Sequence, residues 1–333
     1  MMDRRTYLKS AGVATAGGLA GLAGCVGGNG NGIPTLEYNY VVPIEALGSI
    51  QGIPELQDEL EHYGDEYELN VNQVSGTPDA VMGMASGEVD LAFLTTVSFG
   101  SAIEEDAVPG GITGIMMDFY DAHPDYYGST VYSLPDSDLT DPEDLEGQTL
   151  GINALGTATH AVYVKMFSEV GLDPDDDVEF MELEFPATTA ALEDGRMDAG
   201  FYPPLFASEP RDEGFTEVFT SHDAWDEMYP FSFVAATNDS LEEKDDAIAA
   251  WADDCASFFE YVQENRSEVV SLAADHFDIP EPAIDAFYLT EYDFYRQLEF
   301  ETDRFDETLD ELVDLGYLDE QRDWTEYITN EYV

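Results

Sequence analysis

Residues 87–94 read Gly-Glu-Val-Asp-Leu-Ala-Phe-Leu, and residues 195–202 read Gly-Arg-Met-Asp-Ala-Gly-Phe-Tyr. Both stretches place a glycine before an apolar residue and an aspartate, and a short apolar run of strand length follows. Glycine is the residue that most readily ends a helix in the left-handed conformation. We therefore interpret Gly-x-(Val/Met)-Asp as a structural turn from a helix into a strand, in which the aspartate begins the strand.

The same order of segments precedes both stretches. In the first half we expect strands at 36–42, 67–74 and 91–94, with helices at 50–63 and 78–86. In the second half we expect strands at 149–153, 178–183 and 199–202, with helices at 158–170 and 187–194. A β-α-β-α-β unit used twice predicts an α/β fold with two similar lobes. The carboxyl ends of their strands then meet at a shared crevice, where open α/β sheets bind ligands.

A helical tail follows the second unit. We expect a strand at 231–237 and helices at about 242–265, 267–276, 282–289, 291–298 and 303–315. We expect this tail to return to the first lobe and to pack on it. The predicted organisation is then lobe 1 from residues 35–125 plus 232–333, and lobe 2 from residues 126–231.

The charge balance restricts the possible partners. The 333 residues include 72 Asp and Glu but only 11 Lys and Arg, which gives a formal net charge of −61. Nucleic acid and anionic lipid surfaces are excluded as partners, because both need clusters of basic residues. A surface for a cationic partner would concentrate the acid in one segment, whereas here it is spread along the chain. Adaptation to concentrated salt is the interpretation we favour, and in such a medium the net charge does not exclude an anionic substrate.

The first residues are typical of an export signal. Arg4 and Arg5 precede a weakly apolar run at 11–23, which is too short and too rich in glycine to span a membrane. The run ends in Leu-Ala-Gly-Cys at residues 22–25, similar to a lipoprotein cleavage site. We therefore predict a twin-arginine signal over 1–25, lipid attachment at Cys25, and a flexible tether over 26–34.

Familiar catalytic and metal-binding patterns are missing from the sequence. The five histidines are not paired at metal-ligand spacing, and no nucleophile elbow, P-loop or dinucleotide fingerprint is present. Once Cys25 carries lipid, Cys255 is the one remaining cysteine, and its helical apolar context predicts a buried structural thiol. We expect no catalytic residue, no metal and no cofactor.

The most informative loop is Gly-Ile-Asn-Ala-Leu-Gly-Thr-Ala-Thr-His at residues 151–160. A strand ends there, a glycine turn follows, and hydroxyl residues stand at the start of a helix. Free backbone N–H groups and the helix dipole at such a place hold an oxyanion or a carbonyl. The alternative is ordinary capping of the helix by Thr157, and the sequence leaves both interpretations open. Gly156, Thr157 and His160 are our candidate ligand-binding residues in lobe 2.

Equivalent loops also end in small or hydroxyl residues. From these we select Ser75, Thr95 and Thr96 in lobe 1, and Tyr202, which comes directly after a strand of lobe 2. No Lys or Arg falls in any predicted crevice loop. An anionic ligand would therefore be held by backbone amides and hydroxyls, whereas a neutral or aromatic ligand would be held by stacking.

These segments resemble the extracytoplasmic solute-binding proteins of ABC importers, in the group for nitrate, sulfonate, taurine and thiamine-pyrimidine precursors. The similar segments are 87–92, 144–152, 156–160, 170–172 and 192–199. The resemblance implies a type II periplasmic-binding-protein fold, with two lobes, two crossovers between them and closure on a ligand. The first ligand loop, residues 42–47, matches no subfamily, so the resemblance leaves the ligand open.

The expected function is therefore that of a lipid-anchored, monomeric substrate-binding protein on the outer face of the cytoplasmic membrane. It would pass a small organic solute or an oxyanion to ABC permease and ATPase subunits. One alternative is a receptor for a TRAP-type transporter or a sensor kinase. Another is a pyrimidine-synthesising enzyme of the same fold. Those enzymes are intracellular and use a lysine and a cluster of cysteines. This chain has an expected export signal, only three lysines (Lys9, Lys165 and Lys244) and the lone Cys255, which argues against the enzyme.

Overall fold

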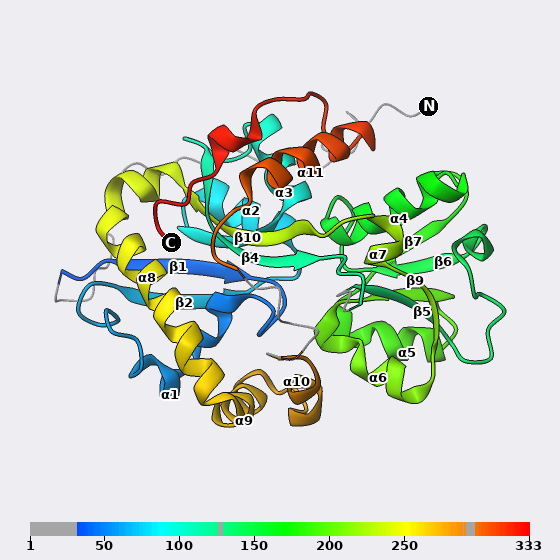
Figure 1. Ribbon diagram of the computed structural model, residues 1–333, viewed down its shortest axis with the longest axis horizontal. Coiled ribbons are helices and arrows are strands. Elements are labelled where there is room, and N and C mark those ends of the chain that lie inside the picture. The colour runs from blue at the N-terminus through cyan, green and yellow to red at the C-terminus, as the bar shows by residue number, and fades with distance from the viewer. Residues whose placement is uncertain (1–31, 126–128, 289, 291–296) are drawn as a thin grey trace, which may run out of the picture. The chain divides into compact units, whose positions relative to one another are not determined.

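The computed structural model describes residues 32–125, 129–288, 290 and 297–333. Its strands form two five-stranded mixed sheets (Figure 1). Several predictions concern residues outside these ranges. They are the export signal over 1–25 with Cys25, most of the tether over 26–34, the first residues of lobe 2 at 126–128, and the greater part of the helix expected at 291–298.

The first sheet has the strand order β2-β1-β3-β10-β4. Its strands are β1 (Thr35–Tyr40), β2 (Glu68–Gln73), β3 (Leu91–Thr95), β4 (Ile112–Asp121) and β10 (Tyr229–Thr237). β1 pairs in parallel with β2 and β3, whereas β10 is antiparallel to both β3 and β4. All residues of β3 and β10 are buried, as expected of strands in the middle of a sheet covered on both faces.

The second sheet repeats this arrangement, with the strand order β7-β6-β8-β5-β9. Its strands are β5 (Thr130–Ser133), β6 (Thr149–Ile152), β7 (Glu179–Glu182), β8 (Ala199–Tyr202) and β9 (Thr216–Thr220). Again three parallel strands, β7-β6-β8, are followed by an antiparallel strand beside β8. The prediction of one unit used twice is confirmed.

The chain passes between the sheets twice. It leaves the first sheet after β4, and it returns after β9 to form β10, in accordance with the two crossovers that the resemblance implied. The fold is therefore a two-lobe type II binding-protein fold. The lobe boundaries at 35–125, 126–231 and 232–333 stay predictions.

Helices flank both sheets (Figure 1). They are α1 (Pro54–Gln57), α2 (Thr77–Ser86), α3 (Thr96–Glu104), α4 (Ala158–Val170), α5 (Thr188–Glu193), α6 (Ser208–Glu213), α7 (Ser221–Ala224), α8 (Asn238–Glu264), α9 (Arg266–Phe277), α10 (Glu281–Phe287) and α11 (Thr302–Asp314). Short 3₁₀ turns are η2 (Leu47–Gly52), η3 (Pro142–Leu145), η4 (Phe185–Ala187), η5 (Pro204–Phe206) and η6 (Trp324–Tyr327).

The prediction of a single helix at 50–63 is wrong. The segment forms η2 and the four-residue α1 instead, and Ile53 between them is extended. The reason lies in Gly52 and Pro54, because glycine weakens a helix and the residue before a proline avoids helical angles. α3 begins directly after β3, where the hydroxyl residues Thr95 and Thr96 predict a loop.

The aspartate of each repeated turn ties together the amino ends of two parallel strands. Asp90 donates its backbone N–H to Glu37 O at 2.9 Å, and its carboxylate accepts the N–H of Glu37 at 2.9 Å. Asp198 and Thr149 make the same two bonds at 2.8 Å. Gly87 and Gly195 have φ of +74° and +66°. The structural interpretation of Gly-x-(Val/Met)-Asp is confirmed.

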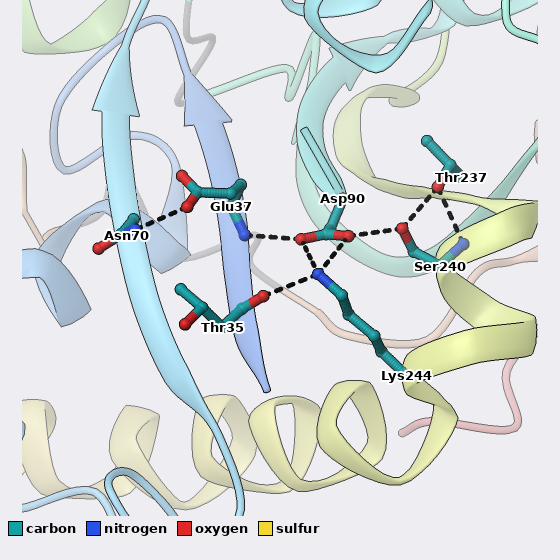
Figure 2. Close-up of polar contacts among 7 residues, drawn as sticks. All are labelled: Thr35, Glu37, Asn70, Asp90, Thr237, Ser240 and Lys244. Atoms are coloured by element: carbon teal, nitrogen blue, oxygen red, sulfur yellow. Dashed lines mark hydrogen bonds and ion pairs between the residues drawn. The ribbon is translucent and has the colours of Figure 1, made fainter. Parts of the chain in front are cut away.

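Asp90 has an additional partner that Asp198 lacks among the described residues. Lys244 Nζ lies 2.7 and 2.8 Å from the two carboxylate oxygens of Asp90, and it also donates to Thr35 O at 2.8 Å (Figure 2). Ser240 Oγ donates to the same carboxylate at 2.6 Å. Lys244 has non-helical backbone angles and kinks α8 at this point. The amino ends of β1, β3 and α8 are thereby joined by one ion pair.

The C-terminal segment packs on the first sheet. Phe305 of α11 makes edge contacts with Phe99 of α3 and Phe233 of β10. Thr329 donates its N–H to Gly114 O of β4 at 2.9 Å.

Cys255 of α8 is 1% exposed, which confirms the prediction of a buried thiol. Its burial raises the pKa of the thiol well above the ordinary value, and a thiol of high pKa is a poor nucleophile.

Candidate functional site

A cavity of about 730 Å³ lies where strands of both sheets end. Val41, Val42 and Pro43 follow β1, and Val74 and Ser75 follow β2. From the second sheet, the wall is made by residues 184–186 after β7 and by Tyr202 and residues 205–206 at the end of β8. The carboxyl ends of parallel strands are the usual place for a ligand in open α/β sheets, and this volume suits a small organic molecule.

Another part of the wall comes from the C-terminal part of the chain. Phe277, Asp278, Ile279 and Pro280 connect α9 to α10 and line the cavity, together with residues 282, 283 and 286 of α10 itself. Asp278 ends α9 in the left-handed conformation with φ of +55°, and its N–H caps the helix on Ala274 O. After this turn, Ile279, Pro280 and Pro282 line the same cavity as the strand ends.

A chain of hydroxyl groups crosses the wall that the second sheet provides. Thr189 Oγ1 of α5 donates to Glu209 Oε2 of α6 at 3.3 Å and lies 3.1 Å from the hydroxyl of Tyr202. Since a threonine hydroxyl has a single proton, its bond to Glu209 leaves Tyr202 as the donor to Thr189. Burial raises the pKa of Tyr202 to about 12. Tyr202 therefore stays a neutral phenol, whose oxygen can still accept a hydrogen bond.

Aromatic rings form much of the apolar lining. The rings of Phe185 and Phe206 are stacked with centroids 6.3 Å apart, and Tyr202 packs edge-on against Tyr132. Phe277 lies in the opposite wall. Stacked and edge-on rings keep fixed orientations, so the lining offers preorganised aromatic surface to a ligand.

Two of the sequence-predicted residues, Ser75 and Tyr202, line the cavity, one from each sheet. Thr95, Thr96, Gly156, Thr157 and His160 are not among its lining residues. A Cβ atom built on Gly76 would lie 3.5 Å from Ala154 Cβ, so the loop after β2 and the loop after β6 are close neighbours.

Thr95 and Thr96 begin α3 and are almost fully buried. Thr95 and Ser98 form a capping box, with their hydroxyl oxygens 3.0 Å apart and the N–H of Thr95 bonded to Ser98 Oγ at 3.2 Å. These bonds satisfy donors at the start of the helix. Their role in ligand binding stays a prediction.

Thr157 stands at the N-cap of α4, but its hydroxyl makes no cap bond and donates to Ala154 O at 2.8 Å. Gly156 has φ of +71°, and its N–H donates to His160 Nδ1 at 3.3 Å. The hydroxyl of Tyr317 lies 2.8 Å from the same nitrogen. His160 thus connects α4 to the segment after α11, and the ligand-binding role of these three residues also stays a prediction.

Sequence reasoning missed the α9–α10 wall and the carboxylates Glu184, Glu209 and Asp212 that line the cavity. One available signal was the Asp-Ile-Pro-Glu-Pro run at 278–282, a rigid break between two helices. The carboxylates gave no signal, because acidic residues occur throughout this chain.

No group of three or more His, Cys, Asp or Glu side chains is placed to hold a metal ion within the described ranges. Among the same residues, no helix has the length and apolar character that a membrane crossing requires.

Comparison with known families decides the classification. The profile of the NMT1/THI5 like family matches residues 65–267, which span both sheets. The chain belongs to the NMT1/THI5 like family. A search of curated proteins gives no match to this NMT1/THI5-like chain.

Solved structures show the same fold at low sequence identity. The alkanesulfonate-binding protein SsuA from Xanthomonas axonopodis pv. citri, bound to MOPS, has a TM-score of 0.71 at 12% identity, covering 89% of this chain and 98% of that one. The periplasmic aliphatic sulphonate binding protein SsuA from Escherichia coli has a TM-score of 0.66 at 16% identity, covering 89% and 92%. A ligand-binding component of an ABC-type import system from Staphylococcus aureus, with zinc bound, has a TM-score of 0.69 at 13% identity, covering 90% and 97%.

Proposed function

We propose that this NMT1/THI5-like protein is the substrate-binding subunit of an ABC importer. In this role it captures a small organic solute, or an oxyanion of the sulfonate, nitrate or pyrimidine-precursor class, and presents it to permease and ATPase subunits. The observation that carries the proposal is the cavity, because strand ends of both sheets contribute to its lining. A ligand that touches both sides stabilises the closed arrangement of the lobes, and this population shift signals the loaded state.

Ligand binding is tested by a thermal-shift screen in multimolar KCl with taurine, alkanesulfonates, nitrate, hydroxymethylpyrimidine and riboflavin. A ligand that binds only the folded state adds about 2.7 kcal/mol to the free energy of unfolding at a concentration 100 times Kd. The melting temperature rises as a result. Ala283→Trp adds a bulky ring to the lining of the cavity and is expected to reduce or abolish the shift. Ala190→Trp, on the exposed side of α5, is the matched control. An unmoved melting temperature with every compound would contradict the proposed ligand classes.

We propose further that the protein is exported by the twin-arginine route and held at the outer face of the membrane by lipid on Cys25. The support is sequence alone, from Arg4 and Arg5 to the Leu-Ala-Gly-Cys run at 22–25. Mass spectrometry of the membrane fraction is expected to find a mature chain that begins at a lipid-modified Cys25. Cys25→Ala is expected to stay uncleaved, and Arg4→Lys/Arg5→Lys is expected to accumulate inside the cell. If the chain without substitutions is found outside the cell and carries no lipid, the proposed lipid anchor is wrong.

The importer partner is distinguished from the alternatives by the neighbouring genes. Genes for a permease and an ATPase beside this one support the proposal. A lone kinase gene points to a sensor, and genes for a TRAP-type permease point to that transporter class.

A further inference from the structure

The charged groups of the cavity are all negative among the described residues. Glu184, Glu209, Asp212 and Asp278 line it, and no Lys, Arg or His of the described part does so. None of the four carboxylates forms an ion pair within that part of the chain. An oxyanion placed here would meet like charges, which disfavour a further negative charge and favour a positive one.

The backbone of the same walls is poor in hydrogen-bond donors. Four lining residues are prolines, at positions 43, 186, 280 and 282, and a proline has no N–H. Several neighbouring N–H groups are already bonded: Val74 donates to Tyr40 O at 2.8 Å, Phe206 to Pro203 O at 3.0 Å, and Ala283 to Pro280 O at 2.9 Å. An anion held by backbone amides and hydroxyls, as expected from the sequence, would find few free amides here and would depend on hydroxyls such as that of Ser75.

Hydrogen-bond acceptors, by contrast, are abundant. The hydroxyl chain runs from Tyr202 through Thr189 to Glu209, which leaves the Tyr202 oxygen and the second oxygen of Glu209 able to accept. Phe185, Phe206 and Phe277 add aromatic surface. Carboxylates, acceptor oxygens and ring faces are together the surroundings that stabilise an ammonium or guanidinium group.

We propose that the cavity binds a small organic cation, with an ammonium or guanidinium group on an apolar or aromatic body, and disfavours oxyanions. The inference rests on the proposed function, since it names the ligand class of the same site. General acidity of the chain does not account for it, because acidic residues alone do not remove backbone donors. In multimolar salt, charges beyond about 3 Å are screened, so the selection is made by groups in direct contact with the ligand.

Three probes that share one ring test the charge preference: benzylammonium, benzyl alcohol and benzenesulfonate, each titrated into the full chain by calorimetry in multimolar KCl. We expect measurable binding of benzylammonium, weaker binding of benzyl alcohol, and none of benzenesulfonate. The same order is expected for butylammonium against butanesulfonate, which removes the ring from the comparison.

Charge-neutralising variants locate the site. Glu209→Gln preserves shape and removes one charge from the cavity, and we expect it to weaken benzylammonium binding about tenfold, or about 1.4 kcal/mol. Glu184→Gln is a second variant with the same expected direction. Glu88→Gln is the matched control, because Glu88 lies next to Gly87 at the amino end of β3, away from the cavity, and we expect it to leave the affinity unchanged.

The outcomes separate this inference from the proposed function. Benzenesulfonate binding without benzylammonium binding overturns the inference and leaves the receptor function intact. So does a thermal shift with nitrate or taurine when no cation binds. Equal losses in Glu209→Gln and Glu88→Gln also overturn it, because the cation would then bind outside the cavity. If neither the cations nor any compound of the thermal-shift screen binds, both proposals are wrong.

Discussion

Two aspartates at equivalent positions have the same local role and different surroundings. Asp90 and Asp198 each join the amino ends of two parallel strands through a pair of backbone bonds. Only at Asp90, among the described residues, does a lysine complete the site, and the Asp90 side chain is 11% exposed. Breaking a buried pair costs more than removing an exposed hydrogen bond, because the remaining charge loses its partner.

We therefore expect Asp90→Ala to lower the free energy of unfolding by about 2–3 kcal/mol and Asp198→Ala by about 1 kcal/mol. Denaturant unfolding in high salt measures both values. Lys244→Ala isolates the ion pair, and the Asp90→Ala/Lys244→Ala double variant gives the coupling between the two side chains. Equal costs at Asp90 and Asp198 would show that Lys244 adds nothing.

His62 provides a pH-dependent contact between the turn after α1 and α8. Its Nε2 lies 3.0 Å from Asp253 and its Nδ1 lies 2.8 Å from Glu66. The hydrogen bond to Asp253, followed by that to Glu66, raises the pKa of His62 above its ordinary 6.5. A protonated imidazole donates from both nitrogens, so the charged ring fits both carboxylates.

The raised pKa determines the direction of the pH effect. A group whose folded pKa exceeds its unfolded pKa stabilises fully below the unfolded value, here 6.5, and loses that effect as pH rises through the folded pKa. His62→Gln is expected to destabilise the protein below about pH 6 and to change it little above about pH 9. Chemical unfolding at both pH values measures this. A loss that is equal at both would contradict the role of the charged ring.

At the scale of elements, a glycine lets α11 pack closely on α3. A Cβ atom on Gly100 would lie 2.9 Å from Leu309 Cδ2 of α11 and 2.9 Å from Leu318 Cδ1. Both leucines are buried, so little room exists for either to move. Gly100 therefore fixes how near the C-terminal segment comes to the first sheet.

Gly100→Val is expected to lower the free energy of unfolding by about 3 kcal/mol, since an overpacked core displaces its neighbours. The neighbouring Ser101→Val is the matched control for the helix propensity of valine, and we expect a loss of less than about 1 kcal/mol. Thermal and denaturant unfolding compare the two. If both variants lose the same amount, the contact with α11 does not limit the packing.

The elements also show how far local sequence determines structure. The helix predicted at 158–170 and the strand predicted at 199–202 have the observed limits of α4 and β8, because turn residues mark them: Gly171 ends α4 and Asp198 precedes β8. The segment at 50–63 has apolar periodicity as well, but Gly52 and Pro54 divide it. A short α3 directly after β3 has no intervening turn residue, so its hydroxyls resembled a loop.

At the scale of the whole molecule, the net charge of −61 is the dominant property. Folding brings these carboxylates closer together, and their repulsion falls as salt shortens the Debye length from about 10 Å at 0.1 M to about 3 Å at 1 M. We propose that the protein is adapted to concentrated salt.

The free energy of unfolding is accordingly expected to fall by several kcal/mol when KCl is reduced from multimolar to about 0.1 M. Urea unfolding across a KCl series measures the loss, since urea is uncharged. Sucrose at low salt is the control, because it strengthens burial without screening charge. If sucrose at low salt restored the full free energy of unfolding, the effect of KCl would come from exclusion of the cosolute and not from charge screening. A free energy of unfolding that does not change with KCl would contradict the proposal.

The sequence by itself determined the duplicated unit, the turns at Asp90 and Asp198 and the burial of Cys255, because each depends on residues within one or two adjacent elements. It also pointed to Ser75 and Tyr202, which line the cavity because both directly follow or end a strand, and their ligand-binding role stays a prediction. Only the tertiary structure decided which strand ends share a cavity. The closeness of Gly76 to Ala154 and the wall from residues 277–286 bring together groups far apart in the chain, and no local pattern encodes such distances. The acceptor-rich lining arises in the same way, since its carboxylates differ from the other acidic residues only in where the fold places them.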